Sequence, residues 1–177
     1  MSDDPAEVRA SRLLRDAGIS RYPIPVEEVA RHLGAVVSLQ PFDSEDISGL
    51  LYRSAGNAPI IGVNSTNIAV RRRFTIAHEI GHLILHGGHE LIVERHVHVN
   101  FRDSAGTVLS PAQEVEANRF AAALLMPGVL LERAMQTLLA GAPAPDTELV
   151  KRLALRFDVS RQAMEFRLAG LGMLTPS

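Results

Sequence analysis

Two histidines four residues apart, inside a segment with unbroken helical spacing, constrain this chain more than any other feature of its sequence. His78 and His82 fall within residues 67–86, where apolar residues recur at the period of an α-helix. Side chains four residues apart lie on one face of a helix, so both imidazoles can reach a single ion. Glu79 projects beside them, where a carboxylate can take a proton from water held by the metal. The segment therefore predicts a metal-binding helix, with His78 and His82 as ligands and Glu79 as the catalytic base.

The remaining histidines of this region fit the same ion poorly. Six of the seven histidines of the chain fall within residues 78–98. A straight helix cannot bring His86 to the same small ion as two histidines on earlier turns, so we interpret His86 as a hydrogen-bonded structural residue. His96 and His98 share one face of a predicted strand, a spacing that can chelate a metal. We favour a solvated or cleft-lining face for this pair.

A third ligand is expected from a later helix. Catalytic zinc takes three protein ligands and keeps one position open for water. A histidine six residues after the motif would serve, but that position is Gly88. On the helix predicted from Pro111, Glu114 heads an apolar stripe that should face the core. A core-facing carboxylate is costly unless it is paired or binds a metal, so we expect Glu114 to be the third ligand. Glu116 falls on the opposite side, and we interpret it as a solvated charge while keeping it as the alternative ligand.

Supporting residues are less constrained by their spacing. Asn118, one helical turn after Glu114, could hydrogen-bond the free ring nitrogen of a zinc-bound histidine and fix its tautomer. An oxyanion formed during attack on an amide needs a hydrogen-bond donor. The candidates for that donor are Tyr52, His96, His98 and Arg102, and the sequence does not choose among them.

Composition limits the class of protein. The chain has 177 residues, 46% of them hydrophobic and 21% charged, as expected for a soluble globular domain with at most a small appendage. There is no cysteine, which excludes disulfides, thiolate metal sites and a cysteine nucleophile. The net charge of −2 gives no reason to expect binding to nucleic acid or to an anionic membrane.

The sequence also predicts the compartment. The N-terminus is acidic rather than basic, so no secretory signal is expected there. The longest apolar run, residues 120–131, is interrupted by Pro127 and Gly128 and is too short to span a bilayer. We therefore expect a cytoplasmic protein without a membrane partner.

The pattern of elements indicates an α+β fold. Short segments rich in branched residues, separated by turn residues, predict three strands of a small, mostly antiparallel sheet, and a further strand with alternating polarity follows the histidine motif. These strands lie at residues 35–39, 49–53, 59–63 and 95–101. Helical patterns cover residues 4–17, 26–33, 67–86, 111–126, 127–139, 147–157 and 160–170.

The predicted elements suggest how the chain is arranged. We expect the sheet to pack on the helix that carries the metal site, and the strand at residues 59–63 to offer its edge to an extended peptide. Residues 1–145 would form one domain and residues 146–177 a C-terminal helical pair, joined by a stiff linker rich in proline.

Two long motifs give the chain a family resemblance. The segments HEIGHLILH at residues 78–86 and EVEANRFAAALLMP at residues 114–127 resemble the ImmA/IrrE family of zinc metallopeptidases. The likeness extends from PVEEVA at residues 25–30 to RFDVS at residues 156–160. The combined pattern is far more specific than the five-residue histidine motif alone.

The resemblance implies a gluzincin-type site on a zincin-type helix. It would hold one zinc ion, or another divalent ion such as Mn²⁺, on His78, His82 and Glu114, with Glu79 as the catalytic residue. Related gluzincins often carry an aspartate where this chain has Asn118. Members of the family are typically intracellular bacterial or phage regulators that cleave or otherwise inactivate a helix-turn-helix repressor. The resemblance therefore implies such a repressor as substrate or partner, and repressor cleavage as a form of transcription regulation.

Two other functions are compatible with the sequence. In the first, the protein is a metal-binding anti-repressor that sequesters its partner without cutting it. In the second, residues 147–170 form a helix-turn-helix in which Arg161, Gln162 and Arg167 contact DNA. The chain is net acidic and lacks a broad basic stripe, so we expect this segment to pack against protein and no direct binding to nucleic acid. The cluster of residues 71–73, three arginines, is interpreted as a solvated helix turn.

Overall fold

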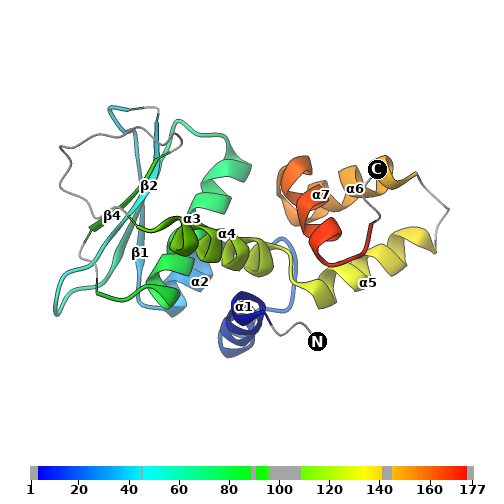
Figure 1. Ribbon diagram of the computed structural model, residues 1–177, viewed down its shortest axis with the longest axis horizontal. Coiled ribbons are helices and arrows are strands. Elements are labelled where there is room, and N and C mark those ends of the chain that lie inside the picture. The colour runs from blue at the N-terminus through cyan, green and yellow to red at the C-terminus, as the bar shows by residue number, and fades with distance from the viewer. Residues whose placement is uncertain (1–3, 45, 89–90, 96–108, 141–144, 175–177) are drawn as a thin grey trace.

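A computed structural model describes residues 4–44, 46–88, 91–95, 109–140 and 145–174 of the chain. Among these residues it has seven helices and four strands, so the fold is α+β. In chain order the elements are α1 (Pro5–Asp16), α2 (Val26–His32), β1 (Val36–Gln40), β2 (Ile47–Tyr52), β3 (Ile60–Asn64), α3 (Ala69–Leu85), β4 (Leu91–Arg95), α4 (Pro111–Leu125), α5 (Gly128–Leu139), α6 (Asp146–Phe157) and α7 (Arg161–Gly170). The sheet lies at one end of the molecule, α3 and α4 cross its middle, and α5, α6 and α7 lie at the other end (Figure 1).

The sheet is mostly antiparallel, with one parallel pairing. Its strand order is β1-β3-β2-β4, and β2 runs antiparallel to both of its neighbours. β3 returns from β2 and inserts between β2 and β1, so β1 and β3 pair in parallel. The three strands expected at residues 35–39, 49–53 and 59–63 are confirmed within about two residues. The expectation that β3 offers a free edge to a peptide is wrong, because β3 has a hydrogen-bonded neighbour on each side.

The fourth strand lies earlier than the alternating pattern predicts. β4 ends at Arg95, where the predicted strand begins, and pairs with β2 across an irregularity in register. Residues 96–101 of the predicted strand lie outside the described part of the chain. The apolar run Leu91-Ile92-Val93 is the sequence signal that marks β4, and Ile92 is buried.

The helix starts and stops follow the local sequence. Asp4 caps α1, its carboxylate accepting a hydrogen bond from the backbone N–H of Ala6 at 2.9 Å. At α4, Ser110 and Gln113 form a reciprocal capping box, with Pro111 in the first turn. This cap fixes where α4 begins, and therefore fixes the position of Glu114 along the axis of the helix, in its first turn.

The helix that carries the histidine motif is the centre of the core. One side of α3 packs against β2 and β3, and its most extensive packing is against α4. Residues 75–82 of α3 are all buried. Gly81 lies at the crossing of the two helices, where a Cβ atom would come within 3.2 Å of the Cα and carbonyl oxygen of Ala117 and of the ring of Phe120. The absence of a side chain at Gly81 is what allows α4 to approach α3 this closely.

Two arginines of the cluster at residues 71–73 belong to the packing, so the interpretation of the cluster as a solvated turn holds only for the exposed Arg71. Arg72 donates to the carbonyl oxygens of Ser65 and Asn67 at 3.1 Å each. Arg73, whose side chain is 14% exposed, donates to the carbonyl oxygen of Ile24 at 2.9 Å and pairs with the carboxylate of Asp158 at 3.1 Å. Arg73 therefore connects α3 to the end of α6.

None of the described helices is by itself long and apolar enough to cross a membrane. Only α4 and α5 taken together meet that requirement by length and composition, and they are bent by 45° where they meet.

Replacing Gly81 with alanine tests the close helix crossing. The new methyl group meets backbone atoms of Ala117, which cannot rotate away, so we expect a loss of about 1–3 kcal/mol in the free energy of unfolding. Urea denaturation measures this loss. Gly87→Ala is the matched control, because nothing lies within 4 Å of the position that its methyl group would take, and it should change the stability little. Equal stability of both variants would contradict this account of the crossing.

Candidate metal centre

Three side chains from α3 and α4 converge on one point. The Nε2 atoms of His78 and His82 lie 2.7 Å apart. The carboxylate of Glu114 lies 3.3 Å from His78 Nε2 through Oε2 and 3.6 Å from His82 Nε2 through Oε1. Among the described residues, these three form the group of histidine and acidic side chains whose ligand atoms are close enough to hold a metal ion.

The orientation of the donors fits a divalent cation. Ligand atoms about 2.0–2.2 Å from a tetrahedral zinc ion lie roughly 3.3 Å from one another, close to the separations of Glu114 from the two histidines and longer than the 2.7 Å between the imidazole nitrogens. Asn118 Oδ1 lies 3.0 Å from His78 Nδ1. A carbonyl oxygen can only accept, so His78 Nδ1 donates and His78 Nε2 keeps its lone pair for the ion. A positive charge between the two nitrogens and the carboxylate, supplied by a proton or by a metal ion, stabilises this arrangement.

The protonation states also suit a metal ligand set. Burial raises the pKa of Glu114, but the hydrogen bonds and charges of His78 and His82 outweigh it and hold the pKa far below its ordinary value. Burial lowers the pKa of His82, against the opposing effect of Glu114. Glu114 is therefore held in its ionised form, in which a carboxylate coordinates a metal, and burial opposes a charge on His82.

Glu79 is fully buried on α3 beside these ligands. A buried carboxylate is costly without a compensating charge. Arg53, the residue after β2, interacts electrostatically with Glu79, and this attraction partly offsets the effect of burial, which lowers the pKa of Arg53. Glu79 is therefore a buried carboxylate, next to the ligand His78 in the helix, that interacts with a partly buried guanidinium.

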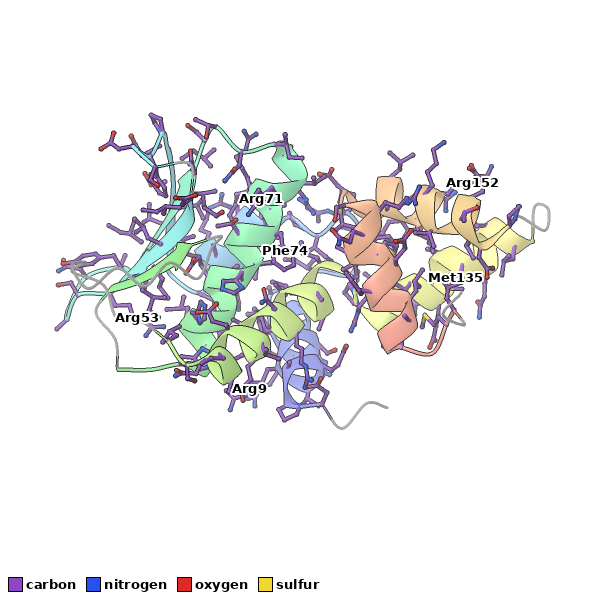
Figure 2. The ribbon with its side chains drawn as sticks, turned by 45° about the horizontal axis from the view of Figure 1, so that its top comes forward. Arg9, Arg53, Arg71, Phe74, Met135 and Arg152 are labelled. Atoms are coloured by element: carbon purple, nitrogen blue, oxygen red, sulfur yellow. The ribbon has the colours of Figure 1, made fainter. Side chains whose placement is uncertain are left out.

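Arg53 also holds the end of the helix that carries the site. Its Nη2 donates to the carbonyl oxygen of His82 at 2.6 Å and its Nη1 to that of His86 at 2.7 Å. In Figure 2 the Arg53 side chain lies between the sheet and the C-terminal end of α3. The carbonyls of the last helical turn carry partial negative charge, so a cation is stabilising there. Sequence reasoning missed Arg53, although a lone arginine shortly after the apolar residues Leu50 and Leu51 was a signal for a buried partner.

His86 lies outside the converging group. Its ring is buried and its Nδ1 lies 2.9 Å from His82 Nδ1, so it is the hydrogen-bonded residue that the helical spacing predicts. The carboxylate of Glu116 lies 3.0 Å from His86 Nε2, and Glu116 is not part of the converging group. Glu116 is mainly exposed, as expected for a solvated charge, and it has in addition a specific contact with His86.

The candidates for an oxyanion donor are placed only in part. Tyr52 is the last residue of β2 and is exposed. His96, His98 and Arg102 lie outside the described residues. The choice among these four remains a prediction.

Comparison with known proteins identifies a family, a curated relative and solved structures that this chain resembles. The family model described as the IrrE N-terminal-like domain (Peptidase_M78) matches residues 30–169. The radiation response metalloprotease IrrE of Deinococcus deserti is 34% identical over 110 residues, which are 62% of this chain and 36% of that protein. A solved structure of a Mycobacterium tuberculosis transcriptional regulator shares the fold, with a TM-score of 0.59 and 17% sequence identity over 93% of this chain and 46% of its own. The chain thus spans about a third of the curated relative and about half of the solved structure.

Replacing Arg53 with methionine tests its role at the helix end. The variant loses two charge-assisted hydrogen bonds and the cation next to Glu79, so we expect about 2 kcal/mol or more to be lost from the free energy of unfolding. Urea denaturation measures it. Arg53→Lys, which keeps the charge but not the two-pronged geometry, should be intermediate. Arg9→Met removes an exposed arginine from α1 and should have little effect; an equal loss in that control would contradict a specific role for Arg53.

Proposed function

Because the chain belongs to the family of IrrE N-terminal-like domains, we propose that it is a zinc-dependent endopeptidase. The observation that carries the proposal is the convergence of His78, His82 and Glu114 on one point, directly beside the buried Glu79. A curated relative is named a metalloprotease, which supports the same reaction class.

His78, His82 and Glu114 would hold the ion, and two imidazoles with one carboxylate are the ligand set of several catalytic zinc sites. Mn²⁺ is the alternative, since carboxylate and imidazole also suit it. Once bound, such an ion acts as a Lewis acid that polarises the scissile carbonyl and lowers the pKa of a coordinated water. Asn118 holds His78 in the required tautomer through its 3.0 Å contact with Nδ1.

Glu79 would move the proton. Its carboxylate takes a proton from the attacking water as general base and then gives it to the leaving amine as general acid. Burial favours the protonated carboxylic acid and the neighbouring Arg53 favours the ionised carboxylate. These opposing effects let one side chain both accept and return a proton within a single reaction.

The proposed substrate is a helix-turn-helix transcriptional repressor, cleaved as a regulatory switch in the cytoplasm. The family resemblance of the two sequence motifs supports this substrate class, and the solved neighbour is titled a transcriptional regulator. The alternative is an anti-repressor that uses the same metal site but sequesters its partner without cleaving it.

Direct binding to DNA through the C-terminal helices is not favoured. Arg167 pairs with Glu7 and donates to the carbonyl oxygen of Met126 at 2.9 Å. Arg161 pairs with Glu165 on its own helix at 3.0 Å. Two of the three side chains that could contact a duplex are therefore engaged within the protein. We propose that residues 1–145 form the peptidase domain and that residues 146–177 are a helical subdomain that packs on protein.

Replacing Glu79 with glutamine tests the chemistry. The variant keeps the three ligands but cannot take a proton, so zinc should stay bound while cleavage falls by at least about 100-fold. The measurement is co-expression with a helix-turn-helix repressor encoded near the gene for this chain, followed by gel analysis for a new fragment. Glu132→Gln, on the exposed face of α5, is the control and should cleave normally. Cleavage at the wild-type rate by Glu79→Gln would refute the mechanism, and a stable complex with no fragment from wild type would favour the anti-repressor.

Replacing Glu114 with glutamine tests the third ligand. The amide is a much weaker ligand than the carboxylate, so the affinity for zinc, measured by competition with a chromogenic chelator, should fall by about 10-fold or more. Glu116→Gln is the matched variant two residues along α4 and should bind zinc nearly as well as wild type. The opposite ranking of the two variants would make Glu116 the ligand.

A further inference from the structure

A chain of hydrogen bonds leads from the candidate metal ligand His82 to the protein surface. His82 Nδ1 lies 2.9 Å from His86 Nδ1, and His86 Nε2 lies 3.0 Å from Glu116 Oε2. His82 and His86 are buried, whereas the side chain of Glu116 is 61% exposed. This series of hydrogen bonds joins the end of α3 to α4 separately from the contact between His78 and Asn118.

The carboxylate of Glu116, at the exposed end of this series, determines the tautomer of His82 at the buried end. The ionised carboxylate of Glu116 can only accept, so His86 Nε2 carries a proton and donates it. A neutral His86 then has an unprotonated Nδ1, which can only accept. His82 Nδ1 must therefore be the donor in its contact with His86. His82 Nε2 is left with its lone pair, and that atom lies 2.7 Å from His78 Nε2 within the candidate metal centre.

We propose that Glu116, acting through His86, is a positioning residue that fixes the Nδ1–H tautomer and the ring orientation of His82 for metal binding. This inference rests on the proposed function, because it takes His82 to be a ligand. The two ligating histidines are then held by different groups. An amide oxygen accepts from His78, whereas a carboxylate acts on His82 through a second imidazole.

The geometry argues against simpler roles for these two residues. His86 Nδ1 faces His82 and its Nε2 faces Glu116, so neither nitrogen is available to the ion. The carboxylate of Glu116 contacts His86 and not His78 or His82. A mainly exposed carboxylate loses little by remaining in water, so its 3.0 Å contact with a buried ring is a specific arrangement rather than a requirement of burial.

The test compares Glu116→Ala with Glu116→Gln, two variants that remove the same charge from an exposed position. Alanine removes the acceptor for His86 Nε2, whereas the glutamine carbonyl oxygen can replace it. We expect Glu116→Ala to weaken zinc binding by about 10-fold or more, measured by chelator competition, and Glu116→Gln to restore most of the affinity. Glu132→Ala, on α5, removes a charge elsewhere and should bind zinc like wild type.

A second readout uses the metal-free protein. Long-range ¹H–¹⁵N spectra of the histidine side chains distinguish protonated from unprotonated ring nitrogens. His82 should be protonated at Nδ1 in wild type and in Glu116→Gln, and should lose this preference in Glu116→Ala. A residue needed only for packing would not change the tautomer of His82.

The outcomes separate this inference from the function on which it rests. If His82→Ala abolishes zinc binding but Glu116→Ala changes neither the affinity nor the tautomer of His82, the positioning role is refuted and the metal site stands. If His82→Ala binds zinc as well as wild type, the proposed metal site itself is refuted.

Discussion

The approach of α4 to α3 is the contact on which the rest of the site depends. The histidines and Glu79 belong to one helix, and Glu114 belongs to another that begins well after α3 ends in the chain. Only a close crossing places the carboxylate 3.3 Å from His78 and 3.6 Å from His82. Gly81, inside the histidine motif, supplies that closeness. One position of the motif thus serves packing while its neighbours serve chemistry.

The core around this crossing combines apolar packing with several buried polar side chains. The buried polar side chains of α3 are Thr75, His78, Glu79 and His82, and His86, directly after the helix, is also buried. Such groups are tolerated in a core only where partners compensate for lost water. Asn118, Glu114 and Glu116 supply partners from α4, and Arg53 supplies them from the end of β2. The polar groups form a connected network between two helices and a strand, which specifies one arrangement of these elements.

Much of this arrangement could be predicted from the sequence, because local rules governed it. The helix positions followed from signals such as the cap Asp4 and the helix-opening Pro111. The helical period separated Glu114 from Glu116 and placed Asn118 where it could reach a ligand histidine, which the structure identifies as His78. What could not be predicted depends on contacts between distant segments. The parallel pairing of β1 with β3 arises because β3 lies between β1 and β2 in the sheet. The order of strands in a sheet cannot be read from the periodicity of the sequence. The roles of Arg53 and of Glu116 depend on which residue lies opposite, since exposed glutamates on a helix look alike in a sequence.

Two arginines tie the ends of α3 to other parts of the fold, and this limits the motion of the helix: Arg53 contacts α3 from the end of β2, and Arg73 belongs to α3 and reaches outward. Arg53 holds the carbonyls of its last turn from the sheet, while Arg73, near its start, reaches Ile24 and Asp158. A rotation of α3 about its long axis by one residue would turn every side chain by about 100°. It would break the guanidinium contacts at both ends at once. The direction in which the two histidines project from the axis of α3 is therefore fixed by the folded chain before an ion binds. Binding of an ion then requires little further ordering of the helix.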